Sequence, residues 1–204
     1  MTQTLAITGA RILCPRSGRD EIATLLVRDR HIAGIGRDAP PEDARIIDGT
    51  GLVLAPGLID AGVFRADPAA ARAGGITRVV LMPDQSPPLD DPALVSYVTG
   101  SGKPDVWVHP LAAATKGLKG EELAEIGLAR TAGAVGVATG RAAIPSTAVM
   151  HRLLSYASAF DLVVVSHAED PWLTAGAVAT EGDYATRLGL SAAPAFAEAL
   201  AIAR

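Results

Sequence analysis

Five apolar runs of strand length, separated by stretches of helical character, constrain the fold of this chain more than any other feature. The runs lie at 58–64, 77–82, 106–111, 134–138 and 162–166, and helical stretches lie at 92–98, 120–132 and 146–160. Sequences such as Val-Val-Leu-Met and Leu-Val-Val-Val are apolar on both faces, as the strands of a buried parallel sheet must be. The alternation therefore predicts βα units of an α/β fold.

The first part of the chain has a different pattern. Short runs of strand character alternate there with turns such as Ser17-Gly18 and with a loop at 38–43 that contains two prolines. Several strands without intervening helices are typical of a small β-sandwich. We therefore expect a β-sandwich segment at 1–54, followed by the α/β domain at 55–204.

The composition excludes several classes of function. The net charge is −4 and no basic run is longer than two residues, which makes nucleic acid and anionic membrane surfaces poor partners. The single Cys14 excludes a disulfide framework and a cysteine-based zinc site. No apolar run reaches the roughly eighteen residues of a membrane span, and the first residues do not resemble a signal peptide. We therefore expect a cytoplasmic protein.

The ends of the strands are where α/β folds of this kind place their chemistry. His167 follows the fifth run and is the only common metal ligand at a strand end, with Glu169 and Asp170 beside it. One interpretation is a residual metal site. The other is a histidine held at a strand end by hydrogen bonds, with the two carboxylates beginning the loop and capping the segment after Pro171.

Longer motifs resemble one enzyme family. They lie at 53–60 (VLAPGLID), 73–83 (AGGITRVVLMP), 115–123 (TKGLKGEEL), 167–170 (HAED) and 181–190 (EGDYATRLGL). Together they resemble the dihydroorotases of the amidohydrolase superfamily. That resemblance implies a (β/α)₈ barrel joined to a β-sandwich, so residues 55–204 are expected to form an incomplete barrel of about five βα units.

The resemblance also implies a zinc-dependent reaction. Dihydroorotases bind one or two Zn²⁺ and interconvert carbamoyl-aspartate and dihydroorotate, with a metal-bound hydroxide attacking the ring amide. The chain departs from the metal-binding pattern at three positions. Gly62 and Phe64 stand where the family has His-x-His, and Thr139 lies where a ligand Asp is expected. Only His167 is left among the ligands that this stretch should supply, and the second His and the catalytic Asp that the resemblance implies would lie beyond Arg204. We therefore expect no cofactor and assign no catalytic residue.

The substrate-binding positions of the family are also changed. An Arg that holds the substrate carboxylate is replaced by Ala66, with Arg65 one residue early and therefore on the opposite face of an extended strand. Asp84 stands in place of an Asn and would repel an anionic substrate. Arg65 and Asp84 are thus the candidate substrate-binding residues that this sequence offers.

Three functions remain open. The first is an inactive dihydroorotase homologue that acts as a structural or regulatory partner in pyrimidine synthesis, with aspartate transcarbamoylase as the partner that the resemblance implies. The second is an active zinc-dependent dihydroorotase or related cyclic amidase. The third is a non-functional fragment of a longer chain, since five strands do not close an eight-stranded barrel. The open edges of such a sheet would favour self-association.

Overall fold

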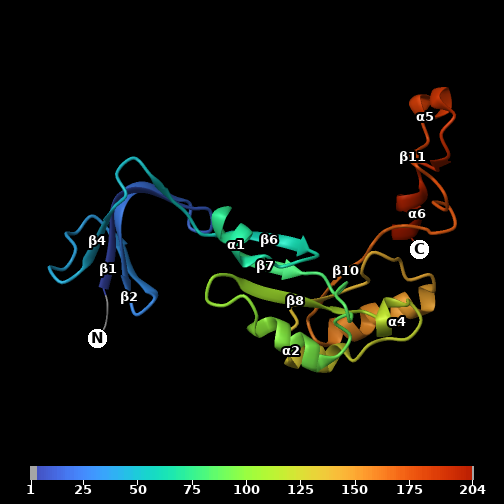
Figure 1. Cartoon of the computed structure of the whole chain (residues 1–204), viewed down its shortest axis with the longest axis horizontal. Coiled ribbons are helices and arrows are strands. Elements are labelled where there is room, and N and C mark those ends of the chain that lie inside the picture. Colours follow the sequence, from blue (N-terminus) through green and yellow to red (C-terminus); the bar gives the residue numbers. More distant parts are fainter. Residues whose placement is uncertain (1–3, 204) are drawn as a thin grey trace. The chain divides into compact units, whose positions relative to one another are not determined.

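The computed structural model describes residues 4–203 and divides into two compact units, Met1–Gly57 and Leu58–Arg204. The boundary expected from the sequence lies between residues 54 and 55. Strands alone make up the first unit, whereas strands and helices alternate through most of the second (Figure 1).

The first unit is a five-stranded mixed sheet. Its strands are β1 (Thr4–Cys14), β2 (Arg19–Arg28), β3 (His31–Gly36), β4 (Arg45–Asp48) and β5 (Val53–Leu54). β2 is antiparallel to β1 and β3, and β4 and β5 run parallel to β1. The expected sandwich segment is thus one sheet rather than two facing sheets. The reason is the length of β1, whose eleven residues pair with β2 on one side and with both β4 and β5 on the other.

The second unit contains the expected parallel sheet. Its strands are β6 (Leu58–Val63), β7 (Ile76–Leu81), β8 (Trp107–Ala113), β9 (Gly136–Ala138) and β10 (Val163–Val165). They pair in the order β10-β9-β8-β7-β6, and every neighbouring pair is parallel. The α/β class and the incomplete barrel are confirmed. β6 and β10 are the two edges of this sheet.

Short helices connect these strands. They are α1 (Pro68–Ala73), α2 (Pro92–Gly100), the 3₁₀ turn Lys116–Leu118, α3 (Ile126–Thr131) and α4 (Thr147–Ala159). The prediction of a helix at 120–132 is wrong for the first half of that range, because α3 begins at Ile126. Residues 120–125 form a loop instead, because the Gly120 N–H donates to the Thr115 hydroxyl and Leu123 forms a β-bridge with Thr115.

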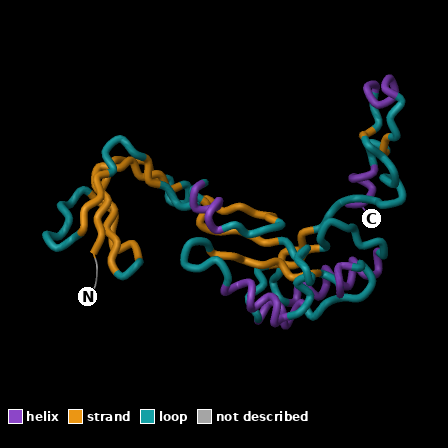
Figure 2. Tube along the Cα trace, in the orientation of Figure 1, coloured by secondary structure: helices purple, strands orange, loops and turns teal. Residues whose placement is uncertain are grey.

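The core of the second unit lies between the helices and one face of the sheet. Val95 of α2 packs with Val79 and Val108, and Leu153 of α4 packs with Val137. Ala112 of β8 belongs to the α2 cluster and is paired with Val137, so α2 and α4 cover the same side of the sheet, as the trace in Figure 2 also shows. On the other face, Met82, Leu111 and Ala138 form a smaller buried cluster toward the carboxyl ends of the strands.

The last part of the chain contains small elements. β11 (Ala179–Thr180) and β12 (Ala192–Ala193) form a parallel two-stranded ladder, and α5 (Asp183–Leu188) and α6 (Ala197–Ala203) follow these strands. Within residues 4–203, every helix falls short of the length and apolar character that crossing a membrane requires.

Candidate functional site

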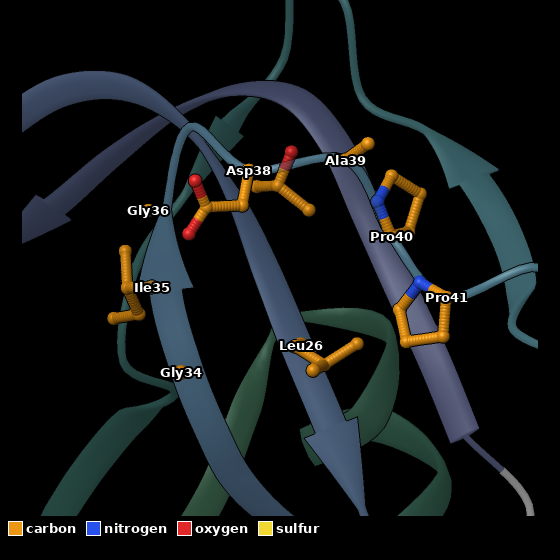
Figure 3. Close-up of a pocket in the computed structure, with 9 residues that line it drawn as sticks. Leu26, Gly34, Ile35, Gly36, Asp38, Ala39, Pro40 and Pro41 are labelled. Atoms are coloured by element: carbon orange, nitrogen blue, oxygen red, sulfur yellow. The ribbon is translucent and has the colours of Figure 1, made fainter.

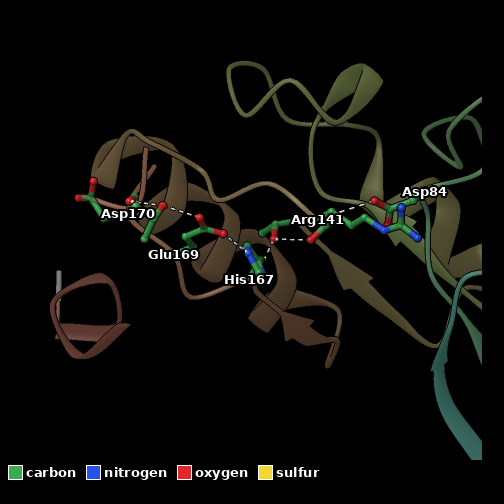
Figure 4. Close-up of polar contacts among 8 residues, drawn as sticks. Asp84, Arg141, His167, Glu169 and Asp170 are labelled. Atoms are coloured by element: carbon green, nitrogen blue, oxygen red, sulfur yellow. Dashed lines mark hydrogen bonds and ion pairs between the residues drawn. The ribbon is translucent and has the colours of Figure 1, made fainter. Parts of the chain in front are cut away.

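The carboxyl ends of the parallel strands bring together residues that are far apart in the sequence. Phe64 follows β6, Asp84 follows β7, Thr139 follows β9 and His167 follows β10. Figure 4 shows the polar contacts that run through this region, from Asp84 and Arg141 to His167, Glu169 and Asp170. Of these, Asp84 and His167 are predicted site residues, whereas Arg141 was not predicted from the sequence.

Asp84 fixes the loop that leaves β9. Its Oδ1 accepts the backbone N–H of Arg141 at 2.9 Å, and its Oδ2 is buried without a hydrogen-bond partner among the described residues. The approach requires glycine at position 140, which has a φ of +78° and whose added Cβ would lie 3.0 Å from Asp84 Oδ1. The Asp84 carboxylate therefore binds the backbone that follows β9, which is separated from β7 in the sheet by β8.

The side chain of Arg141 contacts the ring of Phe64 at the end of β6. The Arg141 guanidinium lies 4.0 Å from the centroid of the Phe64 ring, which is a cation–π contact. Gln85 supports the same segment by donating to the Phe64 carbonyl at 3.1 Å. Arg65 is exposed, and its suggested role in substrate binding stays a prediction. The available signal for Arg141 was its place directly after Gly140, at the end of a buried strand.

His167 is held at two points. Its backbone N–H donates to the hydroxyl of buried Thr139 at 3.0 Å, which ties the end of β10 to the end of β9. Its Nε2 lies 2.5 Å from Glu169 Oε2. A hydrogen bond from Thr174, followed by the contact with His167, holds the pKa of Glu169 below its usual value, so this carboxylate is ionised at neutral pH. The Nε2 atom of His167 is therefore bonded to the Glu169 carboxylate.

Asp170 shapes the loop after β10. It is buried, and its Oδ1 accepts the backbone N–H groups of Trp172 at 2.9 Å and Leu173 at 3.2 Å. This is the capping role that the second interpretation of the sequence gave to the carboxylates near Pro171.

The residues present do not fit the zinc site that the resemblance implies. A catalytic zinc site takes about three protein ligands. Across residues 4–203, no three His, Cys, Asp or Glu side chains lie close enough together to hold a metal ion. His167 and Glu169 form a pair without a third donor, and the cation at the end of β6 is the Arg141 guanidinium.

A pocket in the first unit offers little chemistry. It encloses about 160 Å³ between β2, β3 and the loop that follows β3 (Figure 3). Leu26, Ile35, Pro40 and Pro41 make most of its wall apolar, and Asp38 is the one ionisable residue that lines it. The strand ends of the second unit remain the candidate site.

Comparison with solved structures supports the fold. The L-hydantoinase (dihydropyrimidinase) from Arthrobacter aurescens superposes with a TM-score of 0.76 at 23% identity, over 100% of this chain and 49% of that chain. A D-hydantoinase superposes with a TM-score of 0.66 at 19% identity, over 92% of this chain and 43% of that one. At these identities the likeness concerns the fold alone.

Comparison with known sequences gives the family. The model of the dihydro-orotase-like family matches residues 52–204. The dihydroorotase of Syntrophotalea carbinolica is 40% identical over 98% of this chain and 50% of its own length. A dihydroorotase-like protein of Pseudomonas putida is 38% identical over 98% of this chain and 51% of its own length. The chain thus spans about half the length of these relatives, and it belongs to the dihydroorotase-like family.

Proposed function

We propose that this chain is a non-catalytic member of its family that acts as a structural or regulatory partner in pyrimidine synthesis. The observation that carries the proposal is the state of the strand ends. Phe64 contacts a guanidinium, Thr139 accepts a backbone N–H, and His167 is paired with Glu169. None of these contacts leaves a set of three donors for zinc among residues 4–203.

Aspartate transcarbamoylase is the proposed partner, on the resemblance to dihydroorotases. We expect both proteins in the cytoplasm. The test is to purify the tagged chain together with the transcarbamoylase encoded in the same genome and to measure the mass of the product. A stable complex supports the proposal. A lone chain that leaves the assembly and activity of the transcarbamoylase unchanged contradicts it.

The catalytic part of the proposal has its own experiment. Zinc content is measured by mass spectrometry after purification in zinc-containing buffer, and turnover is measured with dihydroorotate and with carbamoyl-aspartate. We expect zinc far below one ion per chain and no turnover. His167→Ala serves as the matched variant, and its zinc content should equal that of the unchanged protein.

An active zinc-dependent dihydroorotase or cyclic amidase is the alternative. It is favoured by the 40% identity to a protein named dihydroorotase and by the His167–Glu169 pair, which offers two donors. Zinc-dependent turnover that disappears in His167→Ala would establish this alternative. The fragment hypothesis has a separate test, which is the reading frame downstream of codon 204.

A further inference from the structure

An irregularity in β6 turns Phe64 toward the carboxyl ends of the strands, a region that we call the mouth. The register with β7 shifts between Ala61 and Val63, so Gly62 is an extra residue on β6, with a φ of +91°. An extra residue of this kind is a β-bulge, which re-aims the side chains that follow it. Val63 packs against the buried cluster under α2. Because faces alternate along an extended chain, Phe64 turns to the opposite face.

Arg141 reaches the same place from β9 and is held at two points. Its backbone N–H donates to Asp84 Oδ1 at 2.9 Å, and its guanidinium carbon lies 4.0 Å from the centroid of the Phe64 ring (Figure 4). A side chain that is fixed in this way has little conformational freedom left to lose when a ligand binds. The guanidinium group is therefore preorganised.

Stacking on Phe64 occupies the face of the guanidinium group and leaves its edge. The N–H donors of arginine lie in the guanidinium plane, in a fixed fork that matches the oxygens of a carboxylate or a phosphate. Within residues 4–203, no carboxylate forms an ion pair with Arg141. The contact with Phe64 thus leaves the in-plane donors of Arg141 open to an anion.

Arg65 brings a second cation to this part of the mouth. β6 ends at Val63, and Phe64 and Arg65 form a bend, so the alternation of an extended strand does not turn Arg65 away from the mouth. Arg65 is exposed and directly follows the residue on which Arg141 stacks.

The acidic side chains at the strand ends are turned to other partners. Asp84 binds the Arg141 backbone through Oδ1, and its Oδ2 is buried. Glu169 contacts His167, and Asp170 accepts the backbone N–H groups that follow it. The described part of the mouth therefore presents the positive charge of its arginines.

We propose that the mouth binds a small oxyanion, a carboxylate or a phosphate group, through the guanidinium edge of Arg141, with Arg65 as the second cation. Charge-assisted bidentate contacts between arginine and these groups are among the strong hydrogen bonds of proteins. The side chain, and not a metal ion, holds the anion. The inference goes beyond the proposed function, because it needs neither a protein partner nor turnover, and either experiment can fail without the other.

The test is an NMR titration of the isotope-labelled 204-residue chain with sodium malonate and with sodium phosphate, at constant ionic strength, with and without EDTA. We expect saturable shifts of the backbone amide signals of Phe64, Gly140 and Arg141, in the millimolar range that suits partly exposed charges. Malonamide, which has the shape of malonate without its charge, should leave these signals unmoved. The anion that saturates at the lower concentration shows whether carboxylate or phosphate is preferred.

Arg141→Gln should weaken anion binding about tenfold, as expected for the loss of hydrogen bonds to a charged group. Arg65→Gln should weaken it less. Arg141→Lys keeps the charge without the planar fork and should also bind more weakly than the unchanged chain. Arg152→Gln, the same change at an exposed position of α4, is the matched control and should bind normally.

Circular dichroism of each variant shows whether it is folded, and Arg141→Lys decides the outcome if Arg141→Gln does not fold. Shifts that rise linearly without saturation would overturn the proposal, as would equal binding by the unchanged chain and the Arg141 variants. Binding that EDTA abolishes would assign the anion to a metal ion instead of Arg141.

Discussion

The Arg141 guanidinium and the Phe64 ring are in contact, with 4.0 Å between the guanidinium carbon and the ring centroid. The two residues follow β9 and β6, which are separated in the sheet by β8 and β7. The contact therefore spans two intervening strands. Asp84, at the end of β7, accepts the Arg141 N–H and completes the connection. Direct side-chain contacts thus join the strand ends where the family resemblance implies a metal site.

The Phe64–Arg141 contact should be measurable as an energetic coupling. Phe64→Ala and Arg141→Ala should each destabilise the second unit, and a double-mutant cycle should give a coupling of about 0.5–1 kcal/mol, the value for exposed cation–π pairs. Urea denaturation provides the free energies of unfolding. Strictly additive losses would show that the two side chains do not stabilise each other in solution.

Gly140 should tolerate substitution poorly. Gly140→Ala forces a methyl group onto a residue with a φ of +78° and places it 3.0 Å from Asp84 Oδ1, so we expect a loss of about 1–2 kcal/mol from the backbone alone, plus a contribution from the clash. Gly62→Ala is the matched control, since Gly62 has a φ of +91° but open space around its Cβ position. Urea denaturation should rank Gly140→Ala as the costlier change, and the difference should shrink in an Asp84→Ala background.

Thr139→Val should destabilise the chain although it preserves volume. The Thr139 hydroxyl accepts the backbone N–H of His167 and is buried, so the valine leaves that N–H without its partner. Loss of a buried hydrogen bond of this kind costs about 1–3 kcal/mol. Thr139→Ser keeps the hydroxyl and should lose less. Thermal unfolding of the three proteins makes the comparison, and a valine variant as stable as the serine variant would contradict it.

The strands of the second unit could be predicted from sequence because short segments that are apolar on both faces are typical of a buried parallel sheet. The helix that the sequence predicts at 120–132 is longer than the observed α3, Ile126–Thr131, for a different reason. Leucine and isoleucine spacing in that segment suits a helix, but Gly120 and Leu123 bind Thr115 in the preceding loop instead. A tertiary contact of this kind overrides local preference and leaves no trace in periodicity.

The positions of the site residues could be predicted from the sequence, but the contacts between them could not. Phe64, Asp84, Thr139 and His167 could be placed at strand ends, because Phe64 is the last residue of an apolar run and the other three come one or two residues after such a run. Their contacts could not be predicted. The position of Arg141 depends on the left-handed backbone of Gly140, and that conformation is set by the three-dimensional path of the loop.

Stability should depend on pH through His109. Burial and the charges of Arg78 and Lys103 hold the pKa of folded His109 below its ordinary value of 6.5. As the pH falls through 6.5 the unfolded chain takes up this proton first, so folding loses free energy until the folded His109 is protonated as well. Urea denaturation between about pH 7 and about pH 5 should show this decline. His109→Gln should flatten it and Arg78→Met should reduce it; an unchanged slope in His109→Gln would place the dependence on other groups.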